Sequence, residues 1–110
     1  MNINTQEESG FTIIKLEGDV DLSCSPDARK SILEILHANT NLLIDLASVT
    51  YIDSSGVASL VEGYQTAKKQ TLKFGLVGVS DAAMSVLKLA RLDKVFPIYN
   101  SINEYTAEDA

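Results

Sequence analysis

The stretch LLIDLASVTYIDSSGVASLVEGY, residues 42–64, decides the fold. Its first part, Leu42-Leu43-Ile44-Asp45-Leu46, is nearly all apolar, which is typical of a central strand covered on both faces. Farther on, apolar side chains recur at helical spacing, at Val57, Leu60, Val61 and Tyr64. The polar tetrapeptide Asp53-Ser54-Ser55-Gly56 separates the two patterns. The stretch therefore predicts a buried strand that leads, through a polar junction, into a helix.

Two strands are predicted before this stretch. Asn2 to Glu7 indicates a weak edge strand, and Phe11 to Leu16 indicates a stronger one that is rich in isoleucine and aromatic residues. Glu8-Ser9-Gly10 is typical of a turn. We therefore expect an antiparallel hairpin that ends at Gly18.

The first helix is expected to begin at Ser25-Pro26 and to end near His37 to Asn41. Ser25 can cap free amide groups, and Pro26 suits the first helical position because it has no amide hydrogen. The apolar face of this helix is predicted at Ala28, Ile32, Ile35 and Leu36.

Strands and helices continue to alternate after the central stretch. Leu72 to Val77 indicates a strand, Ser80 or Asp81 can cap a third helix, and Phe96 to Tyr99 is a short strand whose proline suits a sheet edge. This alternation predicts an α/β fold, with a mixed, mostly parallel sheet of about five strands and helices packed on it.

The C-terminal part is expected to contain a short helix and a tail. Ser101 and Glu104 have the spacing of a capping box, so a final helix is predicted after them. The length of the chain fits one domain, for which we predict residues 1–105. Residues 106–110 are predicted to form a loose acidic tail.

Charge and composition narrow the classes of function. The net charge of −6, from 15 acidic and 9 basic residues, argues against nucleic-acid binding, which needs a basic face. Cys24 is the only cysteine, so an internal disulfide is excluded. The polar N-terminus does not resemble a secretory signal, and no apolar stretch is long enough to span a bilayer. We therefore predict a cytoplasmic protein without direct membrane insertion.

The sequence shows no recognisable catalytic or metal-binding pattern. The lone histidine, His37, lies near a predicted helix end, and no hydrolase elbow, phosphate-binding glycine loop or pair of zinc ligands occurs. Asp19, Asp21 and Asp53 lack the spacing of a calcium loop. We therefore predict a protein that is not an enzyme, with no catalytic residue, no metal and no cofactor.

The junction Asp53-Ser54-Ser55-Gly56 is the strongest candidate site. A helix start carries unpaired amide groups and a partial positive charge, so it can hold an anion such as phosphate. Asp53 or Ser54 can cap the helix, which places the Ser55 hydroxyl in the first turn near the surface. Gly56 leaves room for approach to the backbone. Ordinary capping also accounts for polar residues at such a position, so the tetrapeptide alone leaves both interpretations open.

Ile52 to Val57 resembles the signature of the STAS domain, which occurs in sulfate transporters and anti-sigma factor antagonists. The similarity extends from about Phe11 to Tyr99. Segments similar to other parts of the family are Gly18-Asp19-Val20-Asp21, Leu42 to Leu46, Leu76 to Val79 and Leu87 to Phe96.

The resemblance implies a phosphorylation-controlled partner switch. In free-standing bacterial members, the second serine of the pair is phosphorylated by an anti-sigma factor serine kinase, which binds the unphosphorylated antagonist. A PP2C-type phosphatase restores the binding form. Carried over to this chain, the phosphorylated residue is Ser55, flanked by Asp53, Ser54 and Gly56, with Asp21 nearby in the fold.

The same resemblance leaves an alternative function. Some small STAS proteins are cytoplasmic subunits of ABC systems that transport phospholipids, and their partners are a permease and an ATPase. The paired serines favour the switch, because transporter members often lack a phosphorylatable residue at the second position.

The surface that contacts the partner is expected on the polar side of the helix after the junction. Ser59, Glu62, Gln65 and Thr66 face away from the predicted apolar stripe of that helix. Ordinary solvent exposure would account for the same pattern, so the sequence leaves that alternative open.

Overall fold

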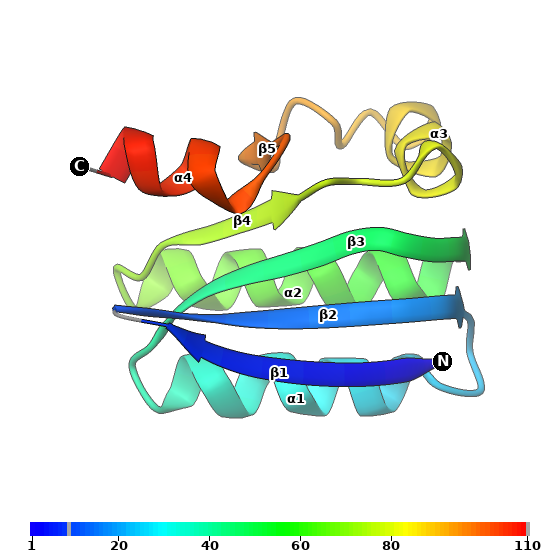
Figure 1. Cartoon of the computed structure of the whole chain (residues 1–110). Coiled ribbons are helices and arrows are strands. Elements are labelled where there is room, and N and C mark those ends of the chain that lie inside the picture. The colour runs from blue at the N-terminus through cyan, green and yellow to red at the C-terminus, as the bar shows by residue number, and fades with distance from the viewer. Residues whose placement is uncertain (9, 110) are drawn as a thin grey trace.

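The computed structural model describes residues 1–8 and 10–109, which form a five-stranded sheet with helices packed against it (Figure 1). Along the chain the elements are β1 (Asn2–Glu8), β2 (Phe11–Val20), α1 (Ser25–His37), β3 (Asn41–Ile52), α2 (Ser54–Lys69), β4 (Phe74–Val77), α3 (Asp81–Leu89), β5 (Ile98–Tyr99) and α4 (Ile102–Asp109). The strand order is β1-β2-β3-β4-β5, with β1 antiparallel to β2 and the other pairs parallel. The predicted α/β fold class with a mixed, mostly parallel sheet is confirmed.

β1 and β2 form the predicted antiparallel hairpin. Their register runs from Asn2 opposite Glu17 to Glu8 opposite Phe11. Ser9, in the middle of the predicted turn, lies outside the described residues. The hairpin places β1 at one edge of the sheet and β2 next to the central strand β3.

The prediction that the hairpin ends at Gly18 is wrong, because β2 continues to Val20. Gly18 has a φ of +90°, and the register between β2 and β3 shifts directly after it. Glycine adopts this backbone conformation without a steric penalty. The irregularity therefore interrupts the ladder without ending the strand, and Val20 still pairs with Ile52 at the end of β3.

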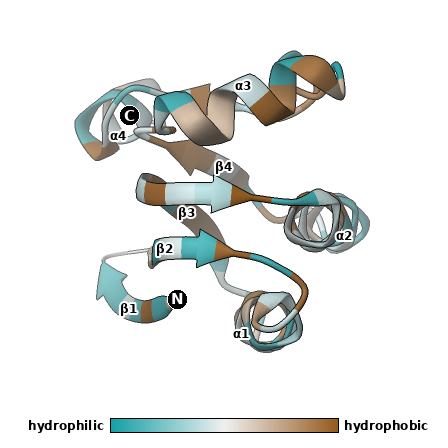
Figure 2. Ribbon diagram, turned by 90° about the vertical axis from the view of Figure 1, so that its right-hand side faces the viewer, coloured by the Kyte–Doolittle hydropathy of each residue, from teal (hydrophilic) through white to brown (hydrophobic). Residues whose placement is uncertain are grey.

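The core lies mainly between the sheet and the two helices α1 and α2, which cover the same face (Figure 2). Ile32 of α1 and Leu60 of α2 are at most 1% exposed there, beside Ile44 of β3. On the opposite face, Tyr105 of α4 packs in a smaller cluster that contains Leu43. Successive residues of β3 thus enter two different clusters, so the strand is buried on both faces, as its apolar run predicts.

The two strands after α2 are shorter than the sequence patterns indicate. β4 begins at Phe74 rather than at Leu72, and β5 consists of Ile98–Tyr99 alone at the far edge of the sheet.

The cap of α3 is Ser80, one of the two predicted candidates, whose Oγ accepts a hydrogen bond of 3.2 Å from the amide of Ala83.

The C-terminal helix α4 starts as predicted but extends farther. Ser101 Oγ accepts a hydrogen bond of 3.2 Å from the Glu104 amide. Residues 106–109 belong to the helix, so the structure differs here from the expected loose tail, and Ala110 lies outside the described residues. Within the described ranges, no helix combines the length and apolar character needed to cross a membrane.

Gly63 lies where α2 packs tightly against both α1 and β4. A Cβ at this position would lie 2.7 Å from Cγ2 of Ile32 and 3.1 Å from Cε2 of Phe74. Both neighbours are buried, so neither can move aside into solvent. Close packing therefore explains a glycine inside a helix, despite its low helix propensity.

We predict that Gly63→Ala lowers the free energy of unfolding by about 1–3 kcal/mol, because overpacking of a rigid core exceeds the gain in helix propensity. Urea denaturation followed by circular dichroism measures this change. The matched control is Gln65→Ala at an exposed position of the same helix, which should change the stability by less than about 0.5 kcal/mol. An alanine variant at position 63 that is as stable as the wild type would contradict the close packing.

Candidate functional site

The predicted junction lies where β3 ends and α2 begins. Asp53 is the N-cap residue of α2, and its Oδ1 accepts hydrogen bonds from the amides of Ser55 at 2.9 Å and Gly56 at 3.1 Å. The cap is therefore Asp53, and not the alternative Ser54, which is exposed as the first residue of the helix. The described geometry matches the expected arrangement, in which Ser55 follows the cap in the first turn.

The Asp53 carboxylate also holds a hydroxyl group and a neighbouring loop. Ser55 Oγ donates a hydrogen bond of 2.5 Å to Asp53 Oδ1, and the amide of Leu22 donates one of 3.2 Å to Oδ2. The hydrogen bond from the Ser55 hydroxyl, followed by those from the Gly56, Ser55 and Leu22 amides, lowers the pKa of Asp53. The carboxylate is thus ionised over the neutral range, and α2 is joined to the loop between β2 and α1.

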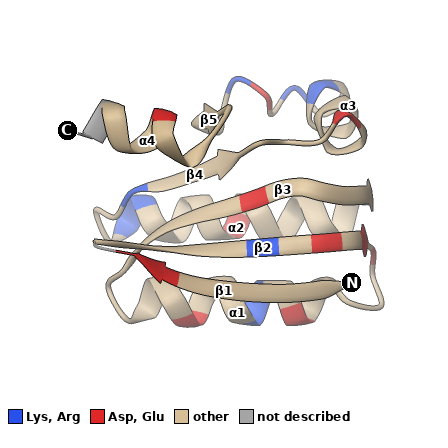
Figure 3. Ribbon diagram, viewed as in Figure 1, with Lys and Arg blue, Asp and Glu red and all other residues tan. Residues whose placement is uncertain are grey.

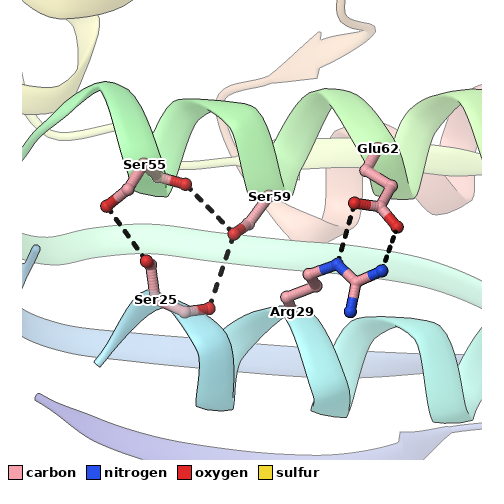
Figure 4. A network of polar contacts seen from close by, with 5 residues as sticks. All are labelled: Ser25, Arg29, Ser55, Ser59 and Glu62. Carbon is pink, nitrogen blue, oxygen red and sulfur yellow. Dashed lines mark hydrogen bonds and ion pairs between the residues drawn. The ribbon is translucent and has the colours of Figure 1, made fainter. Parts of the chain in front are cut away.

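Ser25 is part of the site, contrary to the expectation that it caps α1. The N-cap position of α1 is Cys24, which makes no side-chain capping bond. Ser25 is only 4% exposed, and its Oγ donates a hydrogen bond of 3.0 Å to Ser55 Oγ (Figure 4). Ser55 is half-buried, and its hydroxyl oxygen is hydrogen-bonded to both Ser25 and Asp53.

Sequence reasoning missed the pairing of Ser25 with Ser55, although one signal pointed to it. The two helices follow strands that are parallel in the sheet, so both helices begin at the end of the sheet where these strands finish. A serine in the first turn of each helix can therefore face its counterpart, as the hydroxyl groups do here over a separation of 30 residues.

The sequence pattern predicted that Ser59 faces solvent, but the structure shows that it is buried. It is 7% exposed, and its Oγ donates hydrogen bonds to the backbone oxygens of Ser55 at 3.1 Å and Ser25 at 3.4 Å (Figure 4). The reason is that α1 packs along this side of α2. Of the other residues predicted on that side, Gln65 is exposed and Thr66 is partly buried.

Glu62 remains accessible but is already paired. Its carboxylate accepts hydrogen bonds from Arg29 Nε at 2.8 Å and Nη2 at 2.7 Å, and its side chain is 42% exposed. The hydrogen bonds from Arg29 lower the pKa of Glu62. The pair bridges α1 and α2 at the surface, so Glu62 can contact a partner only together with Arg29.

Asp21 organises the loop before α1. Its Oδ1 accepts hydrogen bonds from the Ser23 amide at 3.0 Å and the Ser23 hydroxyl at 2.5 Å, which lower the pKa of Asp21. The charge of Asp53 acts on the pKa of Asp21 in the opposite direction and raises it. Leu22, the residue after Asp21, donates its amide hydrogen bond to Asp53, so the loop that carries Asp21 is bonded to the junction. In the part of the chain that the structure describes, no three His, Cys, Asp or Glu side chains are grouped as a metal site requires.

Gly56 positions the start of α2 against the sheet rather than leaving an open space. A Cβ there would lie 2.7 Å from Cγ1 of Ile52 and 2.9 Å from Cγ1 of Val20. The ends of β3 and β2 therefore contact the first turn of α2 directly. This contact fixes where the Ser55 side chain projects.

We predict that Asp53→Asn reduces the loss of stability at low pH. The folded-state pKa of Asp53 lies below its ordinary value of 3.8. The ionised carboxylate therefore stabilises the fold above pH 3.8, and this stabilisation is lost as the pH falls through the folded-state pKa. Thermal unfolding midpoints of the wild type should therefore fall more steeply below about pH 4 than those of the variant. Parallel curves for the two proteins would contradict the role given to this carboxylate.

The whole chain can now be placed among known proteins. The STAS domain family model matches residues 2–105. The anti-sigma-F factor antagonist RsfB of Mycobacterium tuberculosis is 26% identical over 107 residues, covering 94% of this chain and 85% of that protein. A crystal structure of an anti-sigma factor antagonist from Mycobacterium paratuberculosis has 27% identity and a TM-score of 0.86, covering 96% of this chain and 92% of its own.

SpoIIAA, a Bacillus cell fate determinant solved in its phosphorylated form, shares the fold. Its TM-score is 0.77 at 14% identity, and the likeness covers 99% of this chain and all of the SpoIIAA chain. The family match over residues 2–105 confirms the resemblance seen at Ile52 to Val57 over almost the full length. The chain belongs to the STAS domain family.

Proposed function

We propose that this chain is a cytoplasmic anti-sigma factor antagonist that acts by binding rather than by catalysis. It binds an anti-sigma factor serine kinase while Ser55 is unphosphorylated, and a PP2C-type phosphatase restores this form after phosphorylation. One observation carries the proposal: the Ser55 hydroxyl is half-buried in the first turn of α2, held by Asp53 and Ser25. The relatives that are antagonists supply the class of partner.

The physical effect of phosphate at Ser55 supports a switch. A phosphoryl group carries about −1.5 to −2 charges at neutral pH. It would replace the hydroxyl proton through which Ser55 now donates a hydrogen bond to Asp53, so a dianion would lie beside an ionised carboxylate. Asp21 lies in the loop that is bonded to the same carboxylate. Acidic residues also mark the end of β2 at this edge of the sheet (Figure 3). Like-charge repulsion and added bulk would then weaken docking of the partner.

The fold itself should survive this modification. Asp53 would still accept the amide hydrogen bonds of Ser55 and Gly56, which cap α2. Val57 and Leu60, the next apolar residues of the helix, are buried in the core. The charge therefore changes the surface at the start of α2, while the packing that holds α2 remains.

We predict that Ser55→Asp weakens binding of the purified anti-sigma factor from the same organism at least tenfold, which corresponds to about 1.4 kcal/mol. Ser55→Ala should bind about as well as the wild type. Isothermal titration calorimetry measures the affinities, and cooperative thermal unfolding checks the fold.

Ser54→Asp is the matched control, because it adds the same charge at the exposed neighbouring residue. It should weaken binding less than Ser55→Asp does. Equal affinities of the wild type and Ser55→Asp would refute the switch.

A pull-down from native lysate with intact-mass analysis tests the class of partner. The proposal requires recovery of an anti-sigma factor kinase and, in part of the protein, a mass increase of about 80 Da, one phosphoryl group. Recovery of a permease with an ATPase, without modification at Ser55, would instead support the subunit of a phospholipid-transport ABC system.

A further inference from the structure

Leu22 presents a large apolar side chain to solvent from the loop that is hydrogen-bonded to the same carboxylate as Ser55. It is 72% exposed, although its backbone amide is fixed by the hydrogen bond to Asp53 Oδ2. The other oxygen of the same carboxylate accepts the Ser55 hydroxyl. The Leu22 amide and the Ser55 hydroxyl are thus both hydrogen-bonded to the Asp53 carboxylate.

The loop that carries Leu22 is fixed by further hydrogen bonds on both sides of it. The Asp21 carboxylate binds the amide and hydroxyl of Ser23, and the Asp21 carbonyl accepts the amides of Cys24 at 3.0 Å and Ser25 at 2.8 Å. An ordered loop loses little conformational entropy when it binds, which favours its use as a contact point.

The residues beside Leu22 are acidic, because Asp21 precedes it in the chain and Asp53 accepts its amide hydrogen bond. Tyr51, two residues before Asp53, is 51% exposed and lies opposite Asp19 in the ladder between β2 and β3. Asp19 lies near the end of β2, Asp21 directly follows β2, and Asp53 directly follows the neighbouring parallel strand β3. The surface thus combines an apolar projection with negative charge.

We propose that Leu22 is the apolar anchor of the docking surface, which inserts into an apolar pocket of the anti-sigma factor bordered by lysine and arginine side chains. This inference rests on the proposed function and adds the chemistry of the contact. A buried apolar anchor supplies affinity, and the carboxylates around it match a basic border and discriminate against acidic surfaces. Phosphate on Ser55 would enter this same contact.

The test compares variants in calorimetric titrations with the purified anti-sigma factor. Leu22→Ala should weaken binding at least tenfold, whereas Leu22→Met, which keeps the apolar volume, should stay within about threefold of the wild type. Leu89→Ala is the matched control, since Leu89 is 86% exposed on α3, and it should bind like the wild type. Unchanged thermal unfolding midpoints exclude loss of the fold.

The charge part of the inference has its own measurement. Asp19→Asn keeps an oxygen that can accept the hydroxyl of Thr50, which now donates to Asp19 at 2.7 Å. It should weaken binding about threefold and reduce the dependence of the affinity on salt. If the affinity and its salt dependence were unchanged, the proposed border of lysine and arginine side chains around the pocket would be contradicted.

The outcomes separate this inference from the function on which it rests. Loss of binding in Ser55→Asp with full binding by Leu22→Ala overturns the anchor and leaves the switch intact. Loss of binding in Leu22→Ala with full binding by Ser55→Asp supports the anchor and overturns the switch. Full binding by both variants overturns both proposals.

Discussion

The arrangement of the candidate site depends on one carboxylate, that of Asp53. Its two oxygens accept hydrogen bonds from the amides of Ser55, Gly56 and Leu22 and from the Ser55 hydroxyl. Hydrogen bonds to an ionised acceptor are stronger than those between neutral groups, and their formation keeps the carboxylate charged. Because the donors belong to α2 and to the loop before α1, this side chain fixes the relative position of both segments.

The contact between α1 and α2 changes in character along its length. At the candidate site it is polar, with the hydroxyls of Ser25, Ser55 and Ser59 bonded to one another or to backbone oxygens. Deeper in the molecule the two helices and β4 meet at Gly63, where a Cβ would crowd Ile32. Polar groups buried here are hydrogen-bonded, so the network sets the alignment of the helices without the cost of unsatisfied groups.

The sequence predicts the layers of this fold more accurately than it predicts which residues contact the polar side chains. A continuous apolar run identifies β3, apolar periodicity identifies α2, and capping preferences narrow the cap of α2 to Asp53 or Ser54, because these signals are local. Periodicity shows which side of a helix faces the sheet, but not which helix covers its flank. Ser59 therefore looked exposed although α1 covers it, and Ser25 looked like a cap although its hydroxyl points across to Ser55. Both errors concern contacts between helices that are distant in sequence.

The structure also distinguishes the two serines of the junction under the proposed function. Ser54 is exposed at the helix start, whereas the Ser55 oxygen is held by Ser25 and Asp53. Phosphoryl transfer depends on positioning, so a fixed acceptor oxygen has an advantage over a freely rotating one. The Ser55 hydroxyl already donates a hydrogen bond to the Asp53 carboxylate. Under the proposed function this carboxylate can take the proton as the Ser55 oxygen bonds to the γ-phosphorus of the kinase's ATP and the bond between that phosphorus and ADP breaks. The contacts that make Ser55 the better acceptor are therefore the ones that connect its charge to the loop carrying Leu22.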